Sequence, residues 1–149
     1  MGRSNVGAGL SSRDEVGGWR FLGKHSIGRV AIVHLGSPMV FPVNYALDGR
    51  TVVFHTGSGT KLGMAVAGCE TAFEVDDAYD VLETGASVMV HGTMQRVTAT
   101  DEKARVEKLG LRTWAPGKRD HVVRVSPAWI SGRRIPVHSN DEGLSADAG

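Results

Sequence analysis

The sequence holds a single cysteine, Cys69, among 149 residues, and it has no long hydrophobic run. One cysteine excludes an intramolecular disulfide, and no Cys/His spacing of the zinc-binding kind is present. Cys69 lies in an apolar stretch, so we expect a buried thiol rather than a nucleophile. Because no 18 consecutive residues are apolar, we expect no membrane-spanning helix.

The sequence also lacks an excess of charge of either sign. Seventeen Lys and Arg residues face 16 Asp and Glu residues, which gives a net charge of +1. No basic stripe is visible, so a nucleic-acid partner is not expected. The first residues lack the apolar core of a signal peptide. These absences favour a cytoplasmic protein with neither nucleic acid nor membrane as a partner.

The length fits one folded domain. The first 12 residues are rich in glycine and polar residues, and the last 12 are small and polar. Such compositions bury too little apolar surface to fold, so they are expected to be disordered. We therefore expect disordered ends at 1–12 and 138–149 around a folded domain at 13–137.

The pattern predicts two main helices. The first begins at Ser11 or Ser12, either of which can cap it, and it buries an apolar side that includes Trp19. The second covers residues 101–112, with Thr100 as its cap and with Val106 and Leu109 on one face. A shorter helical pattern at 61–68 follows a glycine-rich loop.

The rest of the domain is predicted to be strands. β-Branched and alternating segments occur at 28–34, 38–47, 50–56, 70–77, 87–97 and 122–135. A turn is expected at Gly36–Ser37 and a type I′ hairpin at Asp48–Gly49. Gly92 indicates a bulge or a close backbone approach. Short connections between about six strands predict an antiparallel sheet that closes into a small barrel with peripheral helices.

The stretch HTGSGTKLG at 55–63 is rich in donors and poor in side-chain bulk. A Walker motif is excluded, because Thr60 separates Gly59 from Lys61 and Leu62 stands where Ser or Thr is required. A dinucleotide fingerprint is a weak match, because it needs a parallel βαβ unit and the hairpin before this stretch is antiparallel. The glycines could also serve only to supply positive φ angles.

A phosphate site without a metal fits this stretch better. A strand end, a loop with backbone N–H groups and a helix that starts near Lys61 together attract an anion. Thr56, Ser58 and Thr60 add hydroxyl donors, and Lys61 adds a positive charge.

Several segments resemble the pyridoxamine 5′-phosphate oxidase-like flavin-binding split barrels, in particular their nitroimidazole-reductase-like branch. The most specific is PVNYALDGRTVVFHTGSGTKL at 42–62. Weaker matches follow in the family's order, at GRVAIV (28–33), CETAFEVDD (69–77), SVMVHGTMQRV (87–97) and RVSPAWISGRRI (124–135). The resemblance spans residues 13–136 and implies a mainly β fold, a six-stranded antiparallel split β-barrel.

The resemblance also implies a homodimer that holds FMN at its interface. In this family the strand end and the loop after it bind the ribityl phosphate, and the matching residues are His55, Thr56, Ser58, Thr60 and Lys61. The strand implied to lie along the isoalloxazine ring carries Pro42, Val43, Asn44 and Tyr45. The residues implied to reach the flavin from the other subunit are Gln95, Trp129 and Arg133.

The resemblance does not extend to vitamin B6 oxidation. True pyridoxamine phosphate oxidases carry a basic, hydroxyl-rich set that grips the substrate's phosphate, and the spacing of Arg133, Arg134 and His138 does not reproduce it. Other branches of the superfamily use a deazaflavin instead of FMN. The predicted function is an FMN-binding oxidoreductase that moves hydride between a reduced nicotinamide, or another donor, and a small organic substrate. The alternatives are a non-catalytic protein that binds or sequesters flavin or deazaflavin, and a deazaflavin-dependent reductase.

The remaining polar residues predict no catalytic or metal site. His34 and His91 are expected to be structural. Glu74, Asp76 and Asp77 are expected to form a solvated strand end, because nothing else supplies the converging oxygen ligands of a metal site.

Overall fold

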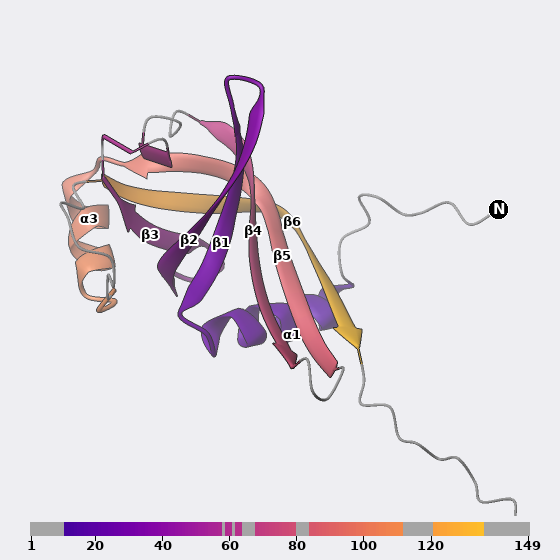
Figure 1. Cartoon of the computed structure of the whole chain (residues 1–149). Coiled ribbons are helices and arrows are strands. Elements are labelled where there is room, and N and C mark those ends of the chain that lie inside the picture. The colour runs from indigo at the N-terminus through magenta and orange to yellow at the C-terminus, as the bar shows by residue number, and fades with distance from the viewer. Residues whose placement is uncertain are drawn as a thin grey trace, which may run out of the picture.

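The computed structural model describes residues 11–57, 59–60, 62–63, 68–79, 84–111 and 121–135. Its elements are α1 (Ser12–Gly23), β1 (Ile27–His34), β2 (Ser37–Leu47), β3 (Val52–Thr56), β4 (Cys69–Tyr79), β5 (Thr84–Val97), α3 (Thr100–Glu107) and β6 (His121–Ile135). The strands close into a barrel in the order β1-β2-β3-β6-β5-β4, and all neighbours are antiparallel (Figure 1). The predicted mainly β, six-stranded antiparallel barrel with peripheral helices is confirmed.

Helix α1 lies across one end of the barrel (Figure 1). Its start is the predicted one, because the Ser11 hydroxyl accepts a hydrogen bond from the Asp14 N–H at 3.3 Å. Trp19 and Leu22 are buried in the main core, and the Tyr45 hydroxyl of β2 donates to the Leu22 carbonyl oxygen. The first helix therefore closes the barrel and is fixed there through β2.

Helix α3 is shorter than predicted and begins one residue earlier. Thr100 was wrongly expected to be the cap: it is the first helical residue, Ala99 occupies the cap position, and no side chain caps the helix. Val106 is fully buried on the outer face of the barrel, against Val53, Val97 and Val122. Leu109 lies beyond the end of the helix and is 37% exposed, so only half of the predicted apolar pair is buried.

Both tight turns are displaced by one residue from their predicted positions. The β1–β2 turn has positive φ at Leu35 (51°) and Gly36 (77°), the pattern of a type I′ turn, rather than at Gly36–Ser37. In the β2–β3 hairpin Asp48 and Thr51 exchange backbone hydrogen bonds of 3.0 and 3.1 Å. Gly49 and Arg50 are thus the central residues. Only Gly49 has positive φ (58°), which is the type II′ pattern rather than the predicted type I′.

Gly92 marks the predicted irregularity in β5. The register with β6 shifts between His91 and Gly92, where β6 bulges. A Cβ atom on Gly92 would lie 2.0 Å from the Ser126 carbonyl oxygen, so the two backbones approach closely here. β6 is one long bent strand, which passes the whole length of β5.

The interior of the barrel is packed with the inward-facing residues of all six strands. Phe73 and Val75 of β4 are buried, as the alternating pattern predicted. Val88 and Val90 of β5 are also buried inside the barrel. These two valines are therefore not available to pack against a partner chain. Cys69 is half-buried and packs against this core.

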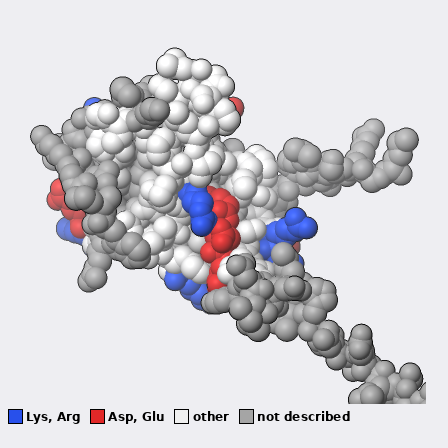
Figure 2. Space-filling model, in the orientation of Figure 1, with Lys and Arg blue, Asp and Glu red and all other residues white. Residues whose placement is uncertain are grey.

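The outer face over β1 and β4 carries a compact ion-pair group. Figure 2 shows basic atoms against a line of acidic atoms on this face, where Arg29 contacts Glu74 at 3.2 Å and Asp76 at 2.5 Å. Pairing with Asp76 raises the pKa of Arg29, while burial and the neighbouring Asp76 raise the pKa of Glu74. Within the described ranges no cluster of His, Cys, Asp and Glu could hold a metal ion, and no helix is long and apolar enough to cross a membrane.

Candidate functional site

The loop after β3 is held in shape by Thr60. Its backbone N–H and its hydroxyl both donate to the Gly57 carbonyl oxygen, at 3.2 and 2.7 Å. The Thr60 hydroxyl also accepts from the Gly63 N–H at 3.0 Å, which is the contact of a helix N-cap with the third helical residue. A Cβ atom on Gly63 would lie 2.0 Å from the Gly57 oxygen, so this tight fold needs glycine at position 63.

Thr56 completes the arrangement from the end of β3. It is 3% exposed, and its hydroxyl lies 3.1 Å from the Thr60 hydroxyl. A hydroxyl carries one proton, and that of Thr60 is directed at Gly57, so Thr56 is the donor in this pair. Both threonines thus use their protons inside the loop. Neither hydroxyl therefore has a proton left to donate to a ligand, and both shape the loop.

We expect Thr60→Ala to loosen this loop, whereas Thr60→Ser should keep it. Loss of a helix N-cap costs about 0.5–2 kcal/mol, and serine supplies the same hydroxyl. Hydrogen exchange at the Gly63 amide should accelerate in the alanine variant alone. Equal exchange in both variants would contradict the capping role of Thr60.

His55 lies next to Thr56 but points to the opposite side of β3. Strand alternation places it with Val53 on the outer face, near Glu107 of α3. Its Nδ1 atom is buried and has no hydrogen-bond partner among the described residues. Burial lowers the pKa of His55, with a smaller opposite effect from Glu107, so the ring is neutral at pH 7. A buried polar atom without a partner fits a ligand hydrogen bond at this position.

A second imidazole lies at the same end of the barrel. His121 opens β6, and it pairs in register with Thr56. Its Nδ1 is also buried without a partner in the part of the chain that the structure describes. His121 could not be predicted from the sequence, because only the strand register brings it beside the loop.

The outer face next to His55 is hollowed. The register Tyr45↔Phe54, continued by one residue, places Asn44 opposite His55. Asn44 lines a cavity of about 300 Å³, which we call the helix-end hollow; its walls are Ser26, Asn44, Tyr45, Ala46, Leu109, Gly110 and Leu111. No sequence pattern predicts this wall, because Leu109 to Leu111 reach β2 only through the fold.

An ion-pair network fixes α3 over this face. Arg105 of α3 donates from Nε and a terminal nitrogen to Asp48 at 3.1 and 3.0 Å, and Arg124 of β6 lies 2.9 Å from the same oxygen. Burial acts to raise the pKa of Asp48, but the hydrogen bonds from Arg105 and the ion pair with Arg124 outweigh it, so the pKa is lowered. The network therefore positions the wall of the helix-end hollow against β2 and β6.

The other predicted residues of β2 divide between its two faces. Pro42 is exposed on the outer face, whereas Val43 is half-buried and faces the core. Tyr45 is buried, and burial raises the pKa of its phenol far above the ordinary value. Its hydroxyl is already bonded to Leu22, so its side chain serves the core.

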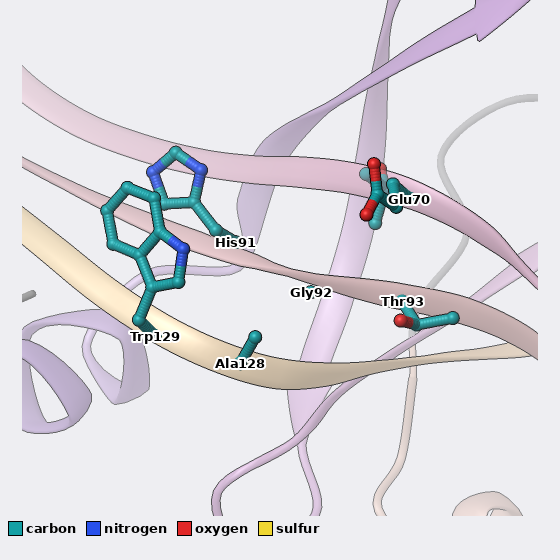
Figure 3. A pocket seen from close by; sticks show the side chains of 7 residues that line it. Glu70, His91, Gly92, Thr93, Ala128 and Trp129 are labelled. Atoms are coloured by element: carbon teal, nitrogen blue, oxygen red, sulfur yellow. The ribbon is translucent and has the colours of Figure 1, made fainter. Parts of the chain in front are cut away.

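The residues predicted to act from the other subunit lie along β5 and β6. Gln95 and Arg133 are exposed. Trp129 stacks on His91, with ring centroids 3.5 Å apart and planes 10° apart. The pair walls a second cavity of about 240 Å³, the aromatic hollow, which is also lined by Glu70, Thr71, Gly92, Thr93 and Ala128 (Figure 3). His91, expected to be structural, is thus half-exposed in a cavity.

The structure therefore separates the predicted site into two groups. Asn44, His55, Thr56 and Thr60 lie around the end of β3, whereas Trp129 lies seven residues along β6 from Val122, the partner of His55. At about 3.3 Å per residue the path along β6 is roughly 23 Å, so the two groups are not neighbours on one subunit. Ser58 and Lys61 lie outside the described residues, as do residues 64–67 of the short helix predicted at 61–68. The same holds for residues 1–10 of the predicted disordered N-terminal end and for all of the C-terminal end at 138–149.

The chain is similar to one protein family, to curated proteins and to solved structures. The profile of the pyridoxamine 5′-phosphate oxidase family matches residues 13–134. The uncharacterized protein Rv0080 of Mycobacterium tuberculosis is 35% identical over 133 residues, which is 85% of each chain. Rv3129 of the same organism, also uncharacterized, is 42% identical over 89 residues, or 60% of this chain and 79% of its own. The structure of the FAD binding protein from Mycobacterium smegmatis superposes with a TM-score of 0.71 at 34% identity and covers 87% of this chain and all of that one.

Proposed function

The chain belongs to the pyridoxamine 5′-phosphate oxidase family. We propose that it is a flavin-binding oxidoreductase that uses FMN. The similar Mycobacterium smegmatis protein is an FAD-binding protein, which supports a flavin. One observation of the structure carries the assignment to the end of β3: a tightly folded loop adjoins two buried imidazole nitrogens that have no partner among the described residues.

The residues present fit such a cofactor. The loop at 57–63 would hold the phosphate, with the positive charge of Lys61 and the hydroxyl of Ser58, while Thr56 and Thr60 keep the loop closed. His55 and Asn44 would meet the polar edge of the ring from the outer face. The helix-end hollow supplies apolar walls from Leu109 and Leu111.

In this proposal the protein contributes binding and orientation. A bound flavin would accept and release hydride, and the protein would bind it, orient it and set its electrostatic surroundings. His55 is neutral, so it donates one hydrogen bond and accepts another without adding charge. None of the described residues stands out as an obligatory acid or base. The proposed substrate is therefore a small organic molecule that needs no protein acid or base to accept hydride. The proposed hydride donor is a reduced nicotinamide or a similar compound.

We expect the protein to be a homodimer. The family resemblance implies a flavin held at the interface of two copies of the chain. The β1–β2 hairpin also exposes Val33 (68%), Leu35 (92%) and Val40 (63%), an apolar surface of the kind that interfaces cover. Light scattering at micromolar concentration should give the mass of two chains. A monomeric mass with cofactor bound would contradict the dimer.

The purified protein tests the assignment as a whole. It should bind FMN and show flavin absorbance, and the absorbance should bleach when reduced nicotinamide nucleotide is added. Flavin binding without any reduction would favour the alternative of a protein that sequesters flavin. Binding of a deazaflavin in preference to FMN would favour a deazaflavin-dependent reductase.

A further inference from the structure

The aromatic hollow lies on the outer face of β4, β5 and β6, away from the loop after β3. His91 and Trp129 stand on this face from neighbouring strands, and Glu70 and Thr93 stand farther along it (Figure 3). Its volume, about 240 Å³, is below the roughly 300–1,000 Å³ of drug-sized ligand sites. It therefore suits a single heterocycle rather than a whole dinucleotide.

The stacked rings give the hollow a flat aromatic wall. The two planes are nearly parallel, at 10°, and the His91 Nε2 lies 3.4 Å from the Ser131 hydroxyl, a contact that orients the imidazole. Burial lowers the pKa of His91, so the wall carries no charge at pH 7. Planar nitrogen heterocycles stack on such walls.

The hollow is lined by one acidic side chain and by no basic one. Glu70 is exposed and carries a carboxylate, and among the residues that line the hollow none is Lys or Arg. Thr71 alternates with Glu70 along β4, so its side chain lies on the opposite face, where its hydroxyl donates to the Ala31 carbonyl oxygen at 2.8 Å. A phosphate or carboxylate ligand is therefore disfavoured, and a ring that donates hydrogen bonds is favoured.

We propose that the aromatic hollow binds an amino-substituted planar heterocycle of the adenine kind, which stacks on His91 and Trp129 and directs its exocyclic amine to Glu70. The site is separate from the proposed flavin site and does not depend on it. The same ring chemistry occurs in a free adenine nucleoside and in the adenosine half of FAD, so the experiment must distinguish these two sources.

The test is calorimetric titration of the full chain with adenosine, and with inosine, in which a carbonyl replaces the amine. Adenosine should bind in preference to inosine. Trp129→Leu should lower the affinity for adenosine by at least about fivefold, which is the lower end of the effect of base stacking. Trp129→Phe should keep part of the affinity that Trp129→Leu loses. Glu70→Gln should reduce the preference for adenosine over inosine. Asp101→Asn, an exposed carboxylate on α3, is the matched control and should change neither affinity.

Titrations with FMN and FAD identify the source of the ring. If it belongs to FAD, Trp129→Leu should weaken FAD but not FMN. If it is a free nucleoside, adenosine should bind the FMN-loaded protein, and FAD and FMN should respond alike to the variant. The proposal is overturned if adenosine does not bind at millimolar concentration. It is also overturned if the Asp101→Asn control loses as much adenosine affinity as the variants of the hollow. A loss of FMN affinity in Trp129→Leu overturns it as well, because that result would place Trp129 on the flavin instead. Failure of FMN to bind the parent protein overturns the flavin proposal alone.

Discussion

Lys61→Ala is expected to weaken FMN binding about ten- to a hundredfold. A hydrogen bond to a charged group contributes about 1.5–3 kcal/mol, and each 1.4 kcal/mol is a factor of ten in affinity. Lys61 follows directly after Thr60, which caps the loop. In our proposal the flavin phosphate is the group that loses its ion pair. Fluorescence titration of FMN with the parent protein and the variant measures the loss.

Two comparisons separate this effect from a general defect. Riboflavin lacks the phosphate, so it should bind the variant as weakly as it binds the parent. Lys108→Ala removes an exposed positive charge just after α3 and should leave FMN affinity unchanged. An unchanged FMN affinity in Lys61→Ala would contradict the assignment of the loop.

Gly92→Ala is expected to destabilise the barrel by at least about 1–3 kcal/mol, the usual cost of overpacking. The added methyl group would meet the Ser126 carbonyl oxygen at 2.0 Å and the Pro127 Cα at 3.0 Å. Both are backbone atoms, so β5 and β6 must move apart at the bulge. Thermal unfolding should begin several degrees lower, since 1 kcal/mol corresponds to roughly 2–8 °C in domains of this size range.

Gly17→Ala is the matched control for this substitution. Gly17 is exposed in α1, and an added Cβ meets nothing within 4 Å. Alanine is favoured over glycine in a helix interior by roughly 0.5–1 kcal/mol, so this variant should be slightly more stable than the parent. If Gly92→Ala unfolded at the temperature of the parent, the close approach of β5 and β6 would be wrong.

The strands could be predicted from the sequence because each one carries its own pattern. Alternation in β4 places Phe73 and Val75 inside, and Ser11 caps α1 through purely local contacts. The one-residue errors at both turns have a common cause. Positive φ can be shared among neighbouring residues, and the register of the flanking strands selects which residue adopts it, as with Leu35.

The site could be predicted only in part, because it depends on which strands become neighbours. The motif around His55 and Thr60 is continuous in sequence, so the sequence alone predicts it. His55 and Thr56 point to opposite faces because β3 is pleated. The Thr56 and Thr60 hydroxyls are hydrogen-bonded within the loop, and this follows only from how the loop folds. His121 reaches the same end only through the pairing of β3 with β6.

The central claim is that the loop after β3 holds the phosphate of a flavin. The most direct measurement is a pair of titrations of the unmodified protein, with FMN and with riboflavin, under the same conditions. The account predicts that FMN binds at least about tenfold more tightly, since one charged hydrogen bond alone is worth about that factor. Equal affinity for the two flavins, or binding of neither, would contradict it.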